Sequence, residues 1–407
     1  MRLAALFLAC GVLAGCERPT GVLEPVAASP PDAAQVDLLV ATTRAPSRDP
    51  GVLFTGERES KIALTDIAVS IPPADHRQVG QVQWPSNLPP NPQTDFATLS
   101  VAPLADAREP QAWLKRNLPH NRRVLVFVHG FNNRFEDAVY GLAQIAHDSG
   151  ADAAPILFTW PSRGSIFQYV YDRESTISSR DALEETLRRV ASDPSVGEVT
   201  VMAHSMGAWL LMETLRQMAI RDGRVTAKVR NVILAAPDVD VDVFATQWRS
   251  IGQTRPRLTV FVSRNDTALR ASRLLAGDVA RLGQIDPLAE PYHTALANSG
   301  IDVIDLSDQR GADRLNHSTF ADNPEIVQRI GQRLIAGEAF AGAGESLGER
   351  VGGFAMGVGQ TVGGAAGLAL SAPIAVVDPN SRRTFDEQVD HLGHVVDETV
   401  EQAEPDQ

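Results

Sequence analysis

Short, nearly continuous apolar runs alternate with amphipathic segments through the middle of the chain. The runs predict buried strands over residues 124–128, 156–159, 199–202, 232–235, 258–262 and 301–306. Apolar residues at helical spacing predict helices over residues 135–147, 181–191, 206–220 and 324–335. Strands that alternate with helices in this way are joined by right-handed crossovers. We therefore expect an α/β fold with a mostly parallel, twisted sheet and helices on both of its faces.

The regions that flank this alternation differ from it. Residues 36–42 and 62–71 read as two N-terminal strands, the second ended by Pro72 and Pro73. After residue 337 the chain becomes rich in Gly and Ala and then acidic. The sequence thus predicts one large domain over residues 36–337 with extensions at both ends.

Composition and charge narrow the possible partners. The chain has 407 residues, 43% of them hydrophobic and 21% charged, which is typical of a folded protein. Its Lys+Arg count of 37 against an Asp+Glu count of 50 gives a net charge of −13. Such a chain repels phosphate backbones, so we expect no nucleic-acid partner.

The first 15 residues have the pattern of a secretion signal. Arg2 supplies a positive charge, and residues 3–12 form an apolar run that is too short to span a bilayer. The tetrapeptide Leu13-Ala14-Gly15-Cys16 resembles the bacterial lipobox. The resemblance implies that Cys16 becomes the lipid-modified first residue after cleavage, and an ordinary signal peptide with a chance cysteine is the alternative.

Lipidation of Cys16 has three consequences. Cys10 would be removed with the signal, so the mature chain would hold no internal disulfide. Residues 16–35, rich in Pro, Ala and Ser, are expected to form a flexible tether. Because Glu17 follows the cysteine, the lipobox resemblance implies a lipoprotein of the bacterial cell envelope, in the outer membrane and facing the periplasm.

The C-terminal extension has two parts. Residues 338–378 are rich in Gly and Ala, and residues 351–377 carry no charge and have glycines four positions apart. Such spacing suits either a membrane-associating or self-associating helix, or a flexible linker. Residues 379–407 form an acidic tail for which we expect a solvated amphipathic helix.

The chemistry centres on Ser205, which stands between a predicted strand and a predicted helix. A serine at such a sharp turn exposes its hydroxyl above the sheet, and small residues two positions away let strand and helix pack closely. Ala203 and Gly207 meet this requirement. The Met206 N–H at the start of the helix can stabilise a developing oxyanion.

This turn resembles the nucleophile elbow of α/β-hydrolases, with Ala203 where the pattern usually has Gly. A narrower resemblance rests on the segments His129-Gly130-Phe131-Asn132-Asn133, Trp160-Pro161-Ser162-Arg163-Gly164, residues 203–207 and Ala236-Pro237-Asp238. Together they resemble the bacterial domain-of-unknown-function family 900 of esterase-like α/β-hydrolases, over residues 36–337. The resemblance implies the α/β-hydrolase fold and leaves the substrate open.

The serine needs a base, and nine histidines compete for the role. His129 and His204 lie inside the motifs, where shaping the backbone is their expected task, although both are pocket candidates. His317 follows the last predicted strand, where the fold places its catalytic base. We therefore predict His317 as the general base.

Two carboxylates are candidates for orienting that base. Asp266 follows residues 258–262, and Asp238 follows the preceding predicted strand, where some members of the fold carry their acid. Asp238, Asp240 and Asp242 alternate with Val and could instead cap the next helix. Asp266 is the preferred acid, and Asp238 remains the alternative.

The loop after residues 124–128 is expected to complete the oxyanion hole. Gly130 permits a tight turn, and the Phe131 N–H would join that of Met206. Asn132 and Asn133 could contact substrate, but we expect them to cap the next helix. Trp160 and Arg163 are candidates for the pocket rim, and a structural role for Trp160 is equally open.

These residues predict a serine hydrolase that cleaves carboxylic esters through an acyl-enzyme, with Ser205, His317 and Asp266 as its triad. No cofactor is called for, and no metal site is expected because His, Cys and carboxylates do not cluster at ligand spacing. A small acyl ester is the expected substrate. The membrane is an expected partner through Cys16. A thioesterase or amidase with the same triad, or a non-catalytic envelope interaction protein, is the alternative.

Overall fold

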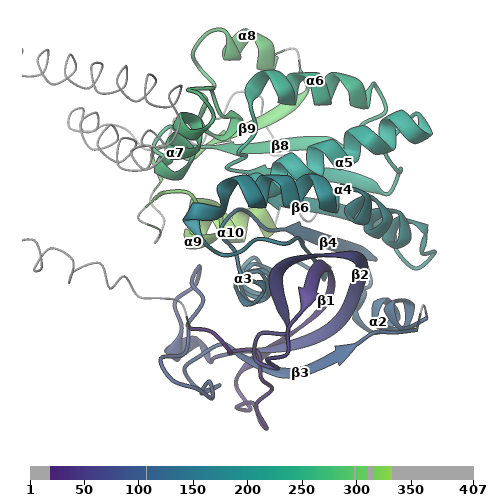
Figure 1. Ribbon diagram of the computed structural model, residues 1–407, viewed down its shortest axis with the longest axis vertical. Helices are drawn as coiled ribbons and strands as arrows, with labels where there is room; N and C mark the ends of the chain where they lie inside the picture. The colour runs from purple at the N-terminus through teal and green to yellow at the C-terminus, as the bar shows by residue number, and fades with distance from the viewer. Residues whose placement is uncertain (1–18, 107, 298, 310–312, 314, 332–407) are drawn as a thin grey trace, which may run out of the picture.

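The computed structural model describes residues 19–106, 108–297, 299–309, 313 and 315–331 (Figure 1). One sheet of nine strands runs through it in the order β3-β2-β1-β5-β4-β6-β7-β8-β9. The predicted parallel strands are β4 (Arg123–Val128), β5 (Ala154–Thr159), β6 (Glu198–His204), β7 (Val229–Ala235), β8 (Arg257–Val262) and β9 (Ile301–Asp305). The expected mostly parallel α/β sheet is confirmed.

The N-terminal strands extend this sheet. They are β1 (Ala34–Pro46), β2 (Phe54–Ile71) and β3 (Ala97–Pro103). Of the three, only β2 runs opposite to the parallel strands. β1 pairs in parallel with β5 and antiparallel with β2, which pairs antiparallel with β3. The sequence predicted only residues 62–71 of β2 because its first half is polar and largely exposed and shows no apolar alternation.

The helices are α2 (Glu109–Asn117), α3 (Phe135–Asp148), α4 (Tyr169–Ser192), α5 (Met206–Asp222), α6 (Val241–Ile251), α7 (Thr267–Leu275), α8 (Tyr292–Ala297), α9 (Thr319–Asp322) and α10 (Pro324–Arg329). Short 3-10 turns are η2 (Ala74–His76), η3 (Ile166–Gln168) and η4 (Leu282–Gln284). Helix α4 begins 12 residues before the predicted residue 181. Its first half was missed because it buries Asp172, Ser175 and Thr176 instead of an apolar stripe.

Helices cover both faces of the sheet. Along β4, Val124 and Val126 belong to one apolar cluster, and Leu125 and Phe127 belong to the other. The first cluster includes buried side chains of α4, α5 and α6, and the second includes those of α3, α9 and α10. The parallel strands therefore form a layer buried on both sides, and their carboxyl ends meet at one edge.

The segment before β1 packs against the body of the fold. Val22 and Leu23 are fully buried, and the Tyr140 hydroxyl donates to the Val22 carbonyl at 2.8 Å. Arg134 donates to the carbonyl of Pro19 at 3.1 Å. The flexible tether expected over residues 16–35 is therefore wrong for its described part, because apolar side chains in it are buried in the core.

Several expectations concern parts of the chain outside the described residues. They are the signal peptide with Cys16, the Gly/Ala-rich residues 338–378 and the acidic tail of residues 379–407. Within the described ranges, no helix is both long and apolar enough to cross a bilayer.

Candidate active site

Ser205 occupies a strained turn between β6 and α5. Its φ of 51° and ψ of −121° lie in a region that costs a non-glycine residue on the order of 1–3 kcal/mol. Two backbone hydrogen bonds tie the turn to β7 and the loop after it, from the Ser205 N–H to the Ala235 carbonyl at 2.9 Å and from the Asp238 N–H to the Ser205 carbonyl at 3.1 Å. Strain that the surroundings enforce in this way is typical of functional sites.

Two glycines let the loop after β4 lie directly against this turn. A Cβ on Gly207 would stand 2.3 Å from the His129 carbonyl oxygen. A Cβ on Gly130 would stand 2.9 Å from both the Ser205 Cβ and the His204 Nδ1. Both contacts are closer than any side chain allows, so the positions require glycine.

This packing brings two backbone donors to the serine. Phe131 follows Gly130, and Met206 begins α5 directly after Ser205. Within the described part of the chain, neither the Phe131 N–H nor the Met206 N–H donates a hydrogen bond. Free amides beside a nucleophile, one of them at the positive end of a helix, suit a developing oxyanion.

Asp266 and His317 are joined. Asp266 is fully buried at the N-cap of α7, where one carboxylate oxygen accepts the Leu269 N–H at 2.8 Å. The other accepts from the His317 Nδ1 at 2.6 Å. The helix cap thus fixes the carboxylate, and the carboxylate fixes the tautomer and orientation of the imidazole.

The pKa of His317 reflects this partner. Burial by itself would lower the pKa, but the negative charge of Asp266 and its hydrogen bond outweigh burial and raise the pKa above its ordinary value. The imidazole is therefore tuned toward accepting a proton.

His204 connects His317 to the serine turn. It directly precedes Ser205, its Nε2 donates to the His317 carbonyl at 3.2 Å, and the two rings lie 4.6 Å apart. Burial and the neighbouring His317 charge hold the pKa of His204 well below its usual value, so it stays neutral. Among the described residues, the Ser205 hydroxyl itself makes no hydrogen bond to the His317 ring.

Asp238, the alternative acid, has other partners. Its carboxylate lies 3.2 Å from the Arg281 Nε and accepts the Ser272 and Tyr169 hydroxyls at 2.5 and 3.0 Å. All four side chains belong to one polar cluster that ties the loop after β7 to α4 and α7. The expected helix cap is confirmed for Asp240, which caps α6.

His129 and Trp160 form a buried pair beneath the site. Their rings stack at 4.8 Å, and the Trp160 indole donates to the His129 carbonyl at 2.9 Å. Burial and the charge of Arg44 lower the pKa of His129 to about 3. Trp160 is 0% exposed and so does not line the pocket rim; of the two roles left open, the structure supports the structural one.

Arg44 holds two loops of the site in place, and it was not identified from the sequence. It is buried in β1 and donates to the Asn133 carbonyl and the Ser162 carbonyl, each at 2.8 Å. Burial lowers the pKa of Arg44 to about 10, against the effect of nearby carboxylates led by Asp172. The presence of an arginine in a mostly apolar strand is the sequence feature that could have identified Arg44.

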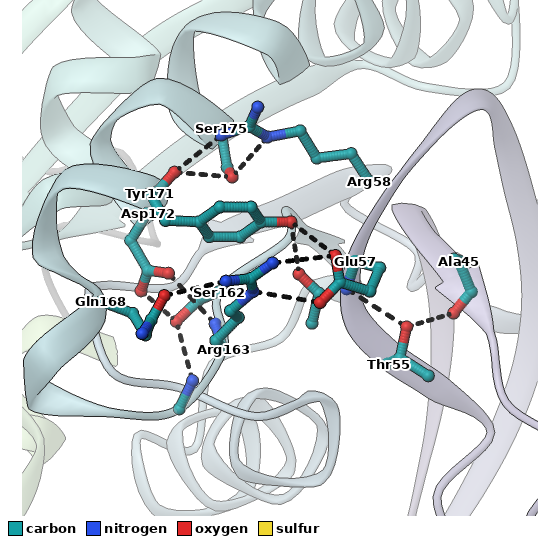
Figure 2. Close-up of polar contacts among 12 residues, drawn as sticks. Ala45, Thr55, Glu57, Arg58, Ser162, Arg163, Gln168, Tyr171, Asp172 and Ser175 are labelled. Carbon is teal, nitrogen blue, oxygen red and sulfur yellow. Dashed lines mark hydrogen bonds and ion pairs between the residues drawn. The ribbon is translucent and has the colours of Figure 1, made fainter.

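Asp172 is a second such residue, on the missed half of α4. Figure 2 shows its carboxylate beside Ser162, whose hydroxyl it accepts at 2.5 Å, and it also accepts the Arg163 N–H at 3.1 Å. The Ser162 hydroxyl accepts in turn from the Asn133 N–H at 3.1 Å. Because burial raises the pKa of Asp172, these donors matter for keeping it ionised.

Asn132 and Asn133, in the loop after β4, do not cap α3, so that expectation is wrong. Arg134 is the N-cap residue, with Asp137 completing a capping box. Asn133 instead donates its side-chain amide to the Phe131 carbonyl at 2.9 Å, and the Asn132 N–H reaches Asp172 at 3.5 Å. Both hold the loop that carries the Phe131 amide.

Arg163 lies at the outer edge of this network. It forms a two-pronged ion pair with Glu57 of β2, at 3.0 and 3.1 Å. Its guanidinium lies 3.7 Å from the centre of the Tyr171 ring, and that of Arg58 lies 4.4 Å from the same centre (Figure 2). Arg163 thus joins the hairpin of β1 and β2 to the site loop.

A small recess borders His317. It is lined by Ala236, Phe261, Leu306, Phe320 and His317 together with neighbouring residues. In the described ranges, no group of three or more His, Cys, Asp or Glu side chains is placed to hold a metal ion.

The chain is similar to several known proteins. The family model described as α/β hydrolase of unknown function (DUF900) matches residues 106–336. An uncharacterized protein of Nostoc sp. is 26% identical over 146 residues, which are 28% of this chain and 38% of that protein. This chain thus spans well under half of the relative.

Solved structures with similar folds include two esterases. One, from Pyrobaculum calidifontis, is 13% identical with a TM-score of 0.34, over 67% of this chain and 81% of the esterase. An esterase/lipase from an uncultured bacterium is 11% identical with a TM-score of 0.33, over 81% of this chain and 95% of that one.

Proposed function

The chain belongs to the DUF900 family of α/β-hydrolases, and from this premise we propose that it is a serine hydrolase that cleaves carboxylic esters through an acyl-enzyme. Ser205 is the nucleophile, His317 the general base and Asp266 the acid that orients the base. The observation that carries the proposal is the strained Ser205 turn beside a histidine that is hydrogen-bonded to a buried carboxylate.

In the first half of the reaction, the His317 Nε2 accepts the Ser205 hydroxyl proton while the serine oxygen attacks the ester carbonyl. The resulting oxyanion accepts hydrogen bonds from the Phe131 and Met206 N–H groups. The alkoxide leaves with the proton from His317, and the acyl group stays on Ser205.

In the second half, His317 takes a proton from water, whose oxygen attacks the acyl carbonyl. The tetrahedral intermediate collapses, Ser205 recovers its proton from His317, and the carboxylic acid is released. The Ser205–His317 hydrogen bond must form for both halves, and such bonds often tighten only when substrate is bound.

We also propose that the enzyme works at the bacterial envelope. The lipobox at Cys16 supports a lipid anchor in the outer membrane with the domain in the periplasm. The Gly/Ala-rich residues 351–377 would add membrane contact or self-association.

Labelling with a fluorophosphonate tests the nucleophile. Mass spectrometry should find the adduct on the peptide that contains Ser205, and Ser205→Ala should abolish it together with hydrolysis of p-nitrophenyl esters. Ser60→Ala, an exposed serine on β2, is the matched control and should react like the parent. A folded protein whose Ser205 stays unlabelled would instead support the non-catalytic interaction protein.

A substrate panel tests the reaction type. Esters, thioesters and amides with the same acyl group should be cleaved in a ratio that favours the esters. A preference for thioesters or amides would redirect the proposal toward a thioesterase or amidase with the same triad.

A further inference from the structure

Three large apolar side chains stand in solvent just after the loop that follows β5. In η3 and the first turn of α4, the exposed fractions are 54% for Ile166, 81% for Phe167 and 71% for Val170. Scattered exposed apolar residues are ordinary, but three within five positions form a local patch. We call Ile166, Phe167, Val170 and Leu275 of α7 the rim patch.

The rim patch borders the proposed active site. Tyr169, which stands between Phe167 and Val170 in the chain, packs its ring 5.3 Å from that of Phe131, whose N–H is a proposed oxyanion donor. The Tyr169 hydroxyl also lies 3.0 Å from that of Ser272 in α7. Leu275, 43% exposed, is one helical turn beyond Ser272 on α7.

The N-terminal segment reaches the same place. Arg134 binds the Pro19 carbonyl, and its side chain lies so close to Gly164 that an added Cβ would be 2.4 Å away. Gly164 precedes Ile166 by two positions. Cys16 is three residues before Pro19, a stretch that reaches about 10 Å at most. A lipid on Cys16 would therefore enter the bilayer close to the rim patch.

We propose that the rim patch inserts into the surface of the lipid bilayer, so that the active site opens toward the membrane and its substrates are acyl esters held in that membrane. This inference rests on the proposed function and on lipidation of Cys16. Insertion would be driven by apolar burial, because a chain with net charge −13 gains nothing from anionic headgroups. We therefore expect a preference for zwitterionic lipid.

A fluorescent label tests the orientation. The mature lipidated chain would hold no free cysteine, so Phe167→Cys and Ile220→Cys would each give one site for an environment-sensitive dye. Ile220 is 64% exposed near the far end of α5 and is the matched control. On phosphatidylcholine vesicles, the dye at position 167 should shift to the blue and be quenched by brominated lipid, and the dye at 220 should do neither.

Two results would overturn the proposal. One is equal, water-like emission at both positions. The other is a blue shift at 167 without quenching by brominated lipid, which would mean that protein, either a second copy or another segment, covers the patch. The label also works in Ser205→Ala, so this readout does not depend on catalysis and fails separately from the proposed function.

Kinetics test the link to substrate. Phe167→Ser combined with Val170→Ser should lower hydrolysis of an ester presented in vesicles at least fivefold and leave hydrolysis of a soluble short-chain ester within twofold. Ile220→Ser should change neither rate. Equal loss on both substrates, or no loss on either, would contradict a membrane-facing site.

Discussion

Asp238 and Asp266 occupy matching places in the fold and have different partners. Each follows one of two neighbouring parallel strands, β7 and β8, and each is buried at the same edge of the sheet. Asp266 binds the imidazole of His317, whereas Asp238 lies against the guanidinium of Arg281.

The difference between the two partners decides what each carboxylate can do. An imidazole changes charge near neutral pH, so in the proposed mechanism Asp266 would stabilise the imidazolium that forms on His317. Asp238 lies in a buried ion pair with Arg281 and accepts two hydroxyl hydrogen bonds, contacts that favour a structural role. Burial and position in the fold are alike for the two carboxylates, so their partners are what distinguishes the proposed acid, Asp266, from Asp238.

The largest expected difference between the two carboxylates is in kcat when each is replaced by Asn. Asp266→Asn removes the charge that stabilises the imidazolium and favours the wrong tautomer of His317, so kcat should fall about 10³- to 10⁴-fold. Asp238→Asn should change kcat less than tenfold. Steady-state ester hydrolysis with both purified variants measures this, and a larger loss for Asp238→Asn would reverse the assignment.

The sequence predicted the parallel half of the fold well, because strands buried on both faces leave continuous apolar runs. It missed the first half of α4 and most of the exposed part of β2, where buried polar groups or solvent replace the apolar pattern. An apolar pattern in the sequence therefore predicts the elements that form the core. It does not predict elements whose side chains are polar.

Some residues of the site could also be predicted from the sequence and others could not. Ser205, Gly130 and Gly207 were readable because a sharp turn and close backbone contact restrict residue type. Asp172 was not, because it lies on the half of α4 that has no apolar stripe. Arg44 was not, because its partners come from loops distant in sequence. The choice between Asp238 and Asp266 stayed open for that reason too: Arg281 and His317 lie 43 and 51 positions downstream.

The next effect is on stability. Asp238→Asn leaves the buried Arg281 cation without its counter-charge, so the free energy of unfolding should fall by about 3 kcal/mol. Denaturant unfolding measures it. Asp242→Asn, at an exposed carboxylate of α6, should cost less than about 0.5 kcal/mol. Adding Arg281→Met to Asp238→Asn should recover part of the loss, and a double variant no more stable than the single one would argue against the ion pair as the cause.

The smallest expected effect is on the pH profile of kcat/KM. Both carboxylates should shift its acid limb in the same direction, Asp266 more than Asp238. His317 must be neutral to act as base, so kcat/KM should rise with pH through the pKa of His317. The charge of Asp266 raises that pKa, and the more distant charge of Asp238 raises it less. Residual activity of Asp266→Asn on an activated ester should therefore show its acid limb at lower pH than the parent, and Asp238→Asn should show a smaller shift in the same direction. Removing a negative charge from beside an imidazole lowers the pKa of the imidazole. A shift of the acid limb to higher pH in either variant would therefore mean that a group other than His317 controls it.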